Sequence, residues 1–268
     1  MRQGLCLTVA DGLCCEAISL ADMSIETQEE LEALRAAGRA VAAAIRAMRV
    51  SVRPGVTTGE LDAIGGRVFR KHGARSGPQL DYGFPGVNCI SVNDEAVHGI
   101  PGKRRLREGD LVKLDVTAEL DGFYADACVS IPVGRPSALA TSLVASARRA
   151  LDNAMDVSQA GAPLNFIGAA VERSVTADGY AVCTDLMGHG IGRKLHEPPH
   201  VPNHYVEALS QPLTEGLVLT IEPIVSAGSG AVRTGRDGWT VKTIDASLSA
   251  HVEHTIVVTN AQPLVLTT

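Results

Sequence analysis

The chain has 268 residues, of which 45% are hydrophobic and 20% are charged, so it is long enough to bury one large core. Its 24 Lys and Arg residues against 30 Asp and Glu residues give a net charge of −6, which argues against nucleic acid, including DNA, or an acidic membrane surface as a partner. The sequence has no stretch of about 18 uncharged apolar residues, so no transmembrane helix is expected.

The N-terminal segment does not fit a secretory signal, because Asp11 and Glu16 interrupt its apolar residues. Met23 stands directly before the first helix signal and is a candidate alternative start. We therefore expect residues 1–23 to form a loosely ordered extension and residues 24–268 to form a single catalytic domain.

The cysteines are scattered and lack the CxxC spacing of a structural zinc site. A chain of this length does not need disulfide bonds to be stable, so we expect free thiols and a cytoplasmic protein. The six cysteines are Cys6, Cys14, Cys15, Cys89, Cys128 and Cys183.

Two helices are predicted near the start of this domain. Thr27 and Glu30 form a capping box, and apolar residues then recur at helical spacing, which predicts a helix over 28–49. After a Pro-Gly break, a second capping box that begins at Thr57 opens a shorter helix ending at Gly73.

The same order recurs later in the chain. Ser137 caps a helix that continues through Met155, and a short helix then ends at Gly179. An internal duplication or the chance likeness of two amphipathic helix pairs would explain this equally well, and a duplication would give two halves facing each other across a cleft. An offset of 106 residues aligns Gly55 with Gly161, Ala63 with Ala169, Arg67 with Arg173 and Gly73 with Gly179.

Runs rich in β-branched residues predict strands at 111–116, 123–133, 217–225 and 252–258. A hairpin turn at Asp121-Gly122 would place Asp115 opposite Cys128. Asp115 and Asp126 would then project from one face as diagonal neighbours. Two carboxylates held so close repel each other unless a proton or a cation lies between them. An edge hairpin with solvent-facing carboxylates is an equal alternative at this stage.

Four more polar residues have a structural and a functional interpretation. His189 and His196 lie in a glycine-rich run that should turn tightly, where a lone His is more often an ordinary polar residue than a ligand. Glu222 and Glu253 lie in apolar strand runs, where a carboxylate either faces solvent or is buried with a partner such as a metal.

Taken together, the four carboxylates and one of the two imidazoles would supply oxygen donors with a single nitrogen. Such a donor set suits a pair of divalent ions, namely Co, Mn, Fe or Zn, that share one water. The pattern is typical of a metal-dependent hydrolase.

Over about residues 24–262 the chain resembles the type I methionine aminopeptidases. The matching stretches follow one another in the family's order and at its spacing. They are 89–101, 114–117, 122–126, 188–192, 220–223, 238–243 and 253–255.

The resemblance implies the pita-bread fold, an α/β (α+β) fold with two pseudo-symmetric helix-helix-strand halves around a curved, mostly antiparallel sheet. It also implies that Asp115, Asp126, His189, Glu222 and Glu253 hold two metal ions, with Asp126 and Glu253 bridging them. The implied activity is removal of the initiator methionine from the N-termini of nascent polypeptides with a small second residue. A cytoplasmic monomer with transient ribosome association is expected.

Roles for individual side chains follow from the same resemblance. Glu222 would take the proton from the attacking water and deliver it to the leaving amine. His196 would donate to the developing oxyanion, and His98 would contact the scissile nitrogen.

The methionine pocket would be built from Tyr82, Phe84, Cys89 and Trp239. The segment around Tyr82 is one residue shorter than the family pattern, and Leu195 stands where the family often has an aromatic residue. The register of Tyr82 and the shape of the pocket therefore stay open.

Three alternatives remain. A proline-specific peptidase of the same fold shares the five-ligand pattern but usually carries a further N-terminal domain. A type II methionine aminopeptidase carries an insertion between His196 and Glu222, where this chain has a short gap. A non-catalytic binding protein on this fold would be expected to lack some of the ligands.

Overall fold

The computed structural model describes residues 25–268. The extension predicted for residues 1–23 and the candidate start at Met23 lie outside the described residues.

The first half of the domain begins with a helix pair and continues into the longest hairpin of the molecule. In chain order its elements are α1 (Gln28–Arg49), α2 (Thr58–His72), β1 (Arg75–Ser76), α3 (Gly77–Tyr82), β2 (Cys89–Val92), β3 (Glu95–Val97), β4 (Leu111–Leu120) and β5 (Phe123–Pro132).

The second half repeats the helix pair and then adds short strands. Its elements are α4 (Ala138–Asp156), α5 (Asn165–Ala177), β6 (Ala181–Val182), β7 (Met187–Gly190), β8 (Glu197–Pro202), β9 (Val218–Ile221), β10 (Ile224–Ser226), β11 (Val232–Thr234), β12 (Val241–Thr243), β13 (Ser249–His251), β14 (Glu253–Val257) and β15 (Leu264–Val265).

Local sequence signals account for the helix ends. Both predicted capping boxes are present, with Thr27 and Thr57 each accepting a hydrogen bond from the backbone of the Glu three residues later. α2 ends at Gly73, whose left-handed backbone (φ 70°) favours glycine. The predicted helices 28–49 and 57–73 are therefore confirmed.

The main sheet has nine strands and is mostly antiparallel, with the order β1-β4-β5-β14-β9-β7-β8 along its main path. Within the β4–β5 hairpin, Asp115 pairs with Cys128, which confirms the predicted register. The predicted strand 217–225 is instead two strands, β9 and β10, in different sheets. The chain changes sheet at Glu222 and Pro223, where Pro cannot donate to the ladder.

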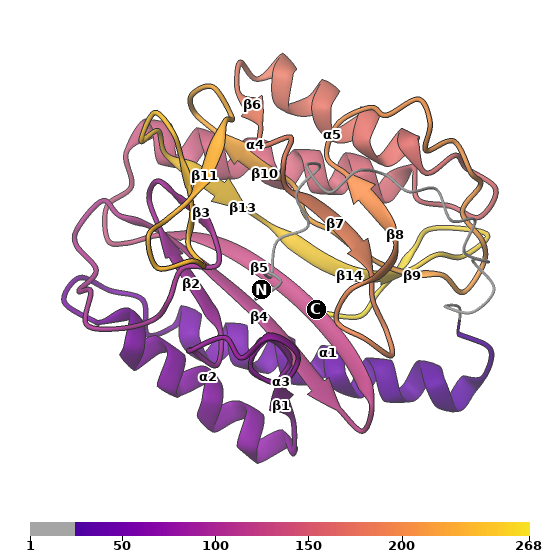
Figure 1. Ribbon diagram of the computed structural model, residues 1–268, viewed down its shortest axis with the longest axis horizontal. Helices are drawn as coiled ribbons and strands as arrows, with labels where there is room; N and C mark the ends of the chain where they lie inside the picture. The colour runs from indigo at the N-terminus through magenta and orange to yellow at the C-terminus, as the bar shows by residue number, and fades with distance from the viewer. Residues whose placement is uncertain (1–24) are drawn as a thin grey trace.

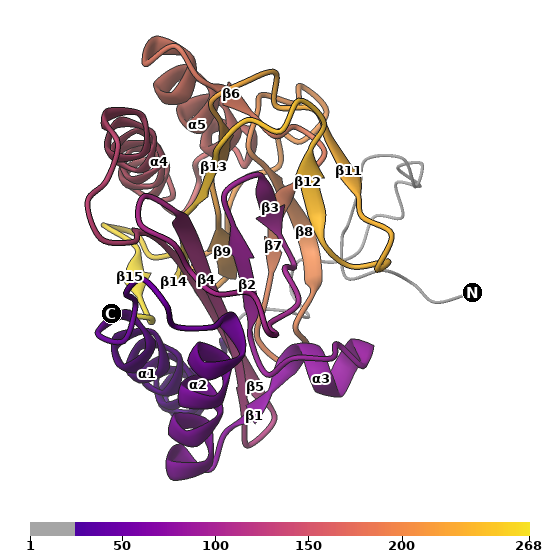
Figure 2. The ribbon, with the colours of Figure 1, turned by 90° about the vertical axis from the view of Figure 1, so that its left-hand side faces the viewer.

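The helices α1, α2 and α4 lie on the opposite side of the main sheet from the small sheet of β3, β11 and β12, whereas the small sheet of β6, β10 and β13 packs against α4 and α5 (Figure 1, Figure 2). Figure 2 shows α1, α2 and α4 on one side, and β3, β11 and β12 on the other. The two helix pairs cover separate hydrophobic clusters, one around Leu61 and Leu114 and the other around Leu143 and Leu219. This arrangement confirms the predicted α/β fold with two halves.

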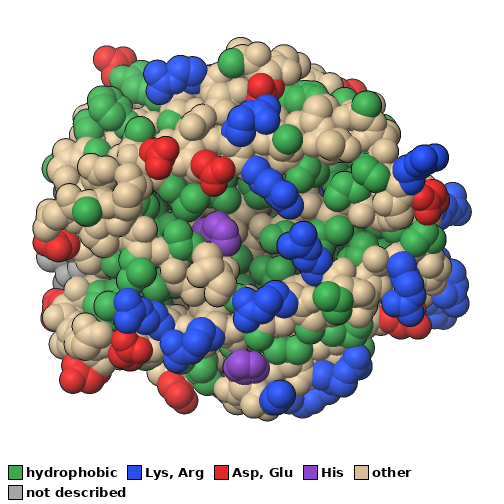
Figure 3. All heavy atoms as spheres, turned by 180° about the vertical axis from the view of Figure 1, so that it is seen from behind, with side chains coloured by type: hydrophobic (Ala, Val, Ile, Leu, Met, Phe, Trp, Pro, Cys, Tyr) green, Lys and Arg blue, Asp and Glu red, His purple; other side chains and the backbone are tan. Residues whose placement is uncertain are grey.

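The face of the molecule that α1, α2 and α4 cover is here called the outer face. Figure 3 shows Lys and Arg side chains spread over this face, with Asp and Glu side chains and hydrophobic surface between them. Arg39 and Arg46 of α1 and Arg148 and Arg149 of α4 are exposed, although the whole chain is acidic. Among the residues that the structure describes, no helix is long and apolar enough to cross a membrane.

Gly38→Ala should destabilise the protein although alanine is the better helix former. Gly38 lies in α1, and a Cβ there would collide with the backbone carbonyl of Leu266. We expect a loss of roughly 1–3 kcal/mol in the free energy of unfolding, because crowding of a packed contact outweighs the gain in propensity of about 1 kcal/mol.

Urea unfolding would measure this change. Gly66→Ala in α2 is the matched control, because a Cβ there meets only the side chains of Val87 and Arg70 at 3.4 Å or more. Gly66→Ala should be neutral or slightly stabilising. Equal stability of the Gly38→Ala protein and the wild type would contradict the packing described for Leu266.

Candidate metal centre

Five neighbouring strands bring the predicted ligands together from distant parts of the sequence. β4 and β5 carry Asp115 and Asp126, β14 begins with Glu253, and β7 carries His189. Glu222 follows β9, which lies between β14 and β7 in the sheet. The order of the strands thus gathers side chains that are up to 138 residues apart (115 to 253).

These side chains meet in one cleft, here called the central cleft. The tightest group is Asp126, His189 and Glu253, whose ligand atoms all lie within 4.8 Å of one another. The predicted residues that line the central cleft are His98, Cys89, Asp115, Asp126, His189, His196, Glu222 and Glu253. The predicted site therefore forms one cavity in the structure.

Asp126, Glu222 and Glu253 are buried and Asp115 is half-buried, so the four charges are poorly solvated and repel one another. Burial raises the pKa of Asp115 and Glu253 well above the usual range, and the charges of neighbouring carboxylates add to this effect. Burial likewise raises the pKa of Asp126 to about 6 and that of Glu222 to about 7. The neighbouring protein groups do not neutralise the negative charge of these four carboxylates.

Hydroxyl groups fix the orientation of two of the carboxylates. Thr117 donates to Asp126 at 2.8 Å, and Thr220 donates to Glu222 at 3.2 Å. The same Thr220 oxygen accepts the backbone N–H of His189 at 3.0 Å. The other carboxylate oxygen of Asp126, Oδ1, is buried and has no hydrogen-bond partner.

His189 presents one ring nitrogen to the central cleft. Its Nδ1 lies 2.8 Å from the backbone carbonyl of Gly190, and its Nε2 lies 3.7 Å from Glu222 Oε1. Burial lowers the pKa of His189, so the ring is neutral and its Nδ1 donates to the carbonyl. Nε2 is then left with a free lone pair, as a metal-binding imidazole requires.

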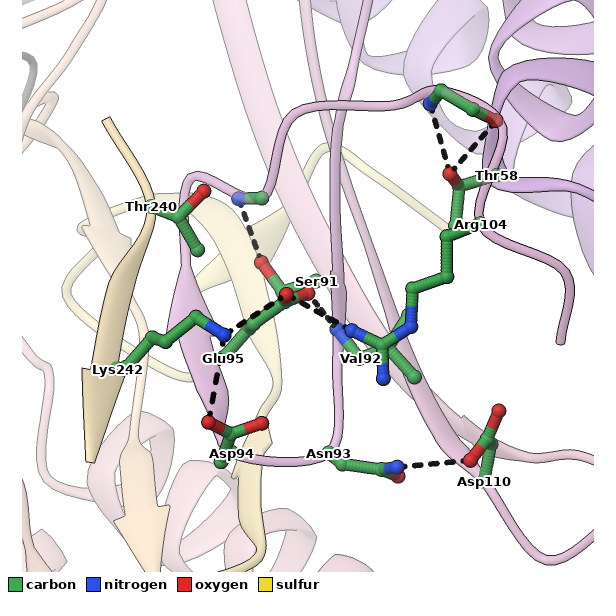
Figure 4. A network of polar contacts seen from close by, with 12 residues as sticks. Thr58, Ser91, Val92, Asn93, Asp94, Glu95, Arg104, Asp110, Thr240 and Lys242 are labelled. Atoms are coloured by element: carbon green, nitrogen blue, oxygen red, sulfur yellow. Dashed lines mark hydrogen bonds and ion pairs between the residues drawn. The ribbon is translucent and has the colours of Figure 1, made fainter. Parts of the chain in front are cut away.

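The segment that carries His98 is held by a polar network between the two halves (Figure 4). Glu95 accepts the backbone N–H of Val92 at 2.8 Å and pairs with Arg104 and Lys242. His98 itself has a left-handed backbone (φ 56°).

The residue after His98 is tied to the same network. Gly99 donates its N–H to Ser91 Oγ at 2.9 Å, and a Cβ on Gly99 would collide with the backbone of Ile90.

Burial lowers the pKa of His98 to about 3, so its imidazole is neutral.

His196 is held by a tyrosine. Tyr82 Oη lies 2.5 Å from His196 Nδ1. Burial raises the pKa of Tyr82 to about 12, while burial and the neighbouring histidines lower that of His196 to about 2. The phenol is therefore the donor and Nδ1 the acceptor, which leaves the proton of the neutral ring on Nε2.

The residues predicted for the methionine pocket form a small apolar cluster beside the central cleft. Phe84 and Cys89 are each 2% exposed, and Tyr82 and Trp239 pack against them. The Phe84 and Trp239 rings meet edge to face with their centroids 5.3 Å apart. The cysteines within the described residues (Cys89, Cys128 and Cys183) are free thiols, as expected.

The donor chemistry of the central cleft fits a divalent metal. A bound cation would neutralise the carboxylates with raised pKa values. It would also give a partner to the unpartnered carboxylate oxygen and to the free nitrogen of the imidazole. Oxygen-rich donors with imidazole suit Mn, Fe, Co or Zn rather than a soft-metal site.

One polar residue of the central cleft was missed by sequence reasoning. His251 at the end of β13 is 2% exposed and lies 3.5 Å from Glu222 and 3.7 Å from Glu253. The sequence signal was present, since His251 precedes Glu253 by two residues, but an isolated His next to a strand did not distinguish it.

Similarity to known proteins agrees with this geometry. Residues 32–260 match metallopeptidase family M24. The chain is 42% identical over 247 residues to methionine aminopeptidase 2 of Bacillus subtilis, an alignment that covers 91% of this chain and 99% of the relative. This chain belongs to the methionine aminopeptidases of family M24.

Further relatives extend this assignment to the fold. The methionine aminopeptidase of Escherichia coli is 41% identical over 240 residues, covering 89% of this chain and 91% of that protein. The crystal structure of the methionine aminopeptidase from Thermotoga maritima has a TM-score of 0.89 at 36% identity and covers 92% of this chain and 99% of that one. The predicted family and pita-bread fold are therefore confirmed.

A prolidase from Pyrococcus furiosus has the same fold at 22% identity, with a TM-score of 0.76. Its alignment covers 92% of this chain but 66% of the prolidase. At this identity the likeness concerns the fold alone.

Proposed function

We propose that the protein removes the N-terminal methionine from nascent polypeptides that have a small second residue. The observation that carries this proposal is the convergence of four poorly solvated carboxylates and His189 in the central cleft, next to an apolar cluster around Phe84 and Trp239. The similarity to methionine aminopeptidases over about nine-tenths of the chain supports the same substrate.

Asp115, Asp126, His189, Glu222 and Glu253 would hold two divalent ions, with Asp126 and Glu253 between them. When bound, such ions polarise the carbonyl of the first peptide bond and make water a better nucleophile near neutral pH. The identity of the ions is proposed as Co, Mn, Fe or Zn from the donor set.

One side chain then transfers the proton, and two histidines contact the groups whose charge changes in the reaction. Glu222, which lines the central cleft, accepts the proton of the attacking water and delivers it to the leaving amine. His196 Nε2–H, oriented by Tyr82, donates to the oxyanion, and His98 contacts the scissile nitrogen.

Substrate selection would come from the apolar cluster. Phe84, Cys89 and Trp239 form an apolar wall suited to an unbranched thioether side chain such as that of methionine. Leu195, 2% exposed, also lines the central cleft where an aromatic residue was expected from the family.

The test of this proposal is release of free methionine from a Met-Ala-Ser peptide. Metal-depleted protein should be inactive, and addition of Mn or Co should restore activity. A Met-Leu-Ser peptide should be cleaved far more slowly because of its large second residue. Cleavage of Xaa-Pro peptides with no release from Met-Ala-Ser would favour the proline-specific alternative instead.

Tyr82→Phe should lower kcat by about tenfold and leave KM nearly unchanged. Phenylalanine keeps the packing of the ring but removes the hydroxyl that holds His196 Nδ1, so the ring can adopt the unproductive tautomer. Steady-state kinetics on Met-Ala-Ser would measure this. Tyr205→Phe is the control, because Tyr205 is 50% exposed. A change confined to KM would show that Tyr82 serves the pocket alone.

We also propose a cytoplasmic monomer that associates transiently with ribosomes. The net charge of −6 disfavours RNA binding by the chain as a whole, but the exposed arginines of α1 and α4 offer local cationic groups that rRNA phosphates attract. Co-sedimentation with ribosomes should weaken as salt rises, and binding that is insensitive to salt would contradict a contact of this kind.

A further inference from the structure

The central cleft contains a second imidazole that the proposed ligand set leaves unused. His251 is 2% exposed, and neither of its ring nitrogens has a hydrogen-bond partner. A buried polar group without a partner is costly and rare, and it points to a ligand that completes it.

The position of this ring is fixed by its backbone. Ser130 accepts the N–H of His251 at 2.9 Å and donates to its carbonyl at 2.8 Å, so β13 is clamped to β5. β13 also pairs with β10, where His251 lies opposite Ile224. The ring therefore projects from a fixed strand end into the central cleft, which it lines.

The distances from His251 are too long for hydrogen bonds and lie at or just above the separation of two ligands on one ion. Its Nε2 lies 3.5 Å from Glu222 Oε2 and 3.7 Å from Glu253 Oε2. Hydrogen bonds from nitrogen to oxygen measure about 2.7–3.2 Å. Donor atoms at about 2.1 Å from a common ion are roughly 3–3.5 Å apart at the angles of tetrahedral and octahedral coordination.

His189 has the same relation to Glu222 from the other side. Its Nε2 is 3.7 Å from Glu222 Oε1, so the two imidazoles flank one carboxylate at nearly equal distances. His189 is the imidazole of the proposed ligand set, and the geometry of His251 matches it.

We propose that His251 is a sixth protein donor to the metal centre, binding through Nε2 the ion that Glu222 and Glu253 share. The inference rests on the proposed function in so far as the central cleft binds metal. It makes the centre richer in nitrogen, with two imidazoles and four carboxylates, which favours Fe, Co or Zn over Mn.

The most direct test counts the imidazole ligands in the wild-type chain. Full-length, metal-depleted protein is loaded with cobalt, and X-ray absorption at the cobalt edge measures histidine coordination. Two imidazoles per two cobalt ions are expected if His251 binds, and one per two ions if His189 is the only imidazole ligand. The second result would overturn the inference.

Variants give an independent measurement. His251→Gln and His251→Leu should each weaken cobalt binding by about 10- to 100-fold in calorimetric titration. His254→Gln is the matched control, because His254 follows Glu253 directly but its Nδ1 binds Thr267. It should bind cobalt like the wild type.

The outcomes separate this inference from the proposed function. Unchanged cobalt affinity in both His251 variants, together with metal-dependent release of methionine by the wild type, would overturn the role of His251 and leave the function standing. A wild-type chain that binds no cobalt would overturn both.

Discussion

Replacing Asp126 with Asn should abolish tight metal binding and lower the rate of methionine release by at least about 1,000-fold, as expected when a bridging ligand is lost. Asp126 lies in the tightest ligand group of the central cleft, and its Oδ1 has no protein partner. An amide carries no charge to balance a cation. Calorimetric titration with Mn or Co and the Met-Ala-Ser assay would measure the two losses.

The same variant should be more stable than the wild type when both are free of metal. Asp126 has a raised pKa because it is buried, and its charge also raises the pKa of Asp115 and Glu253. Removing one of these like charges relieves their repulsion, which we expect to raise the free energy of unfolding by on the order of 1–3 kcal/mol at pH 8.

Urea unfolding in the presence of a chelator would test this. Asp156→Asn, an exposed position of α4, is the control and should change neither metal binding nor stability by more than about 0.5 kcal/mol. A metal-free Asp126→Asn protein that is less stable than the wild type would contradict the electrostatic account of the central cleft.

Glu222→Gln should lower kcat for Met-Ala-Ser by about 100- to 10,000-fold even at saturating metal. Glutamine keeps the size of the side chain and accepts the Thr220 hydrogen bond, but it cannot take a proton from water. Because Glu222 is also a proposed ligand, metal affinity should fall as well, while Asp126, His189 and Glu253 still hold an ion.

The measurement is kcat as a function of metal concentration, so that weak binding and slow turnover are separated. Glu207→Gln is the control, because Glu207 is exposed. Full recovery of kcat at high metal concentration would mean that Glu222 serves only as a ligand and that another group moves the proton.

The helices and the first hairpin could be predicted because their signals are local. Capping boxes at Thr27 and Thr57 specify helix starts through side chains within one turn, and the Asp121-Gly122 turn specifies the register of β4 and β5. The suspected repeat also has a structural counterpart. Gly55 and Gly161 both have a left-handed backbone, with φ of 89° and 87°.

The division of 217–225 into two strands has a local signal in Pro223, which the strand prediction did not use. Val218–Ile221 and Ile224–Ser226 are both buried, and the local pattern does not show that they join different sheets. The break at Glu222 depends on two long-range pairings, of β9 with β14 and of β10 with β13. The same β10–β13 pairing brings His251 into the central cleft, which explains why this residue was missed.

The ligand residues were predicted from family resemblance rather than from geometry. Local pattern gave only the Asp115 and Asp126 pair, and even there solvent exposure was an equal alternative. His189 and Glu253 approach each other because β7 and β14 both pair with β9, one on each side. No local signal specifies this strand order. The Tyr82 contact with His196 is likewise a long-range feature, across 114 residues.

The central claim is that side chains from β4, β5, β7, β9 and β14 bind two cations in one cleft. Measuring the stoichiometry of Mn or Co binding to metal-depleted protein tests it most directly. The structure predicts two ions per chain in the wild type and loss of tight binding in the Asp126→Asn protein. A wild type that binds no ion, or a variant that binds the ions as tightly as the wild type, would contradict the claim.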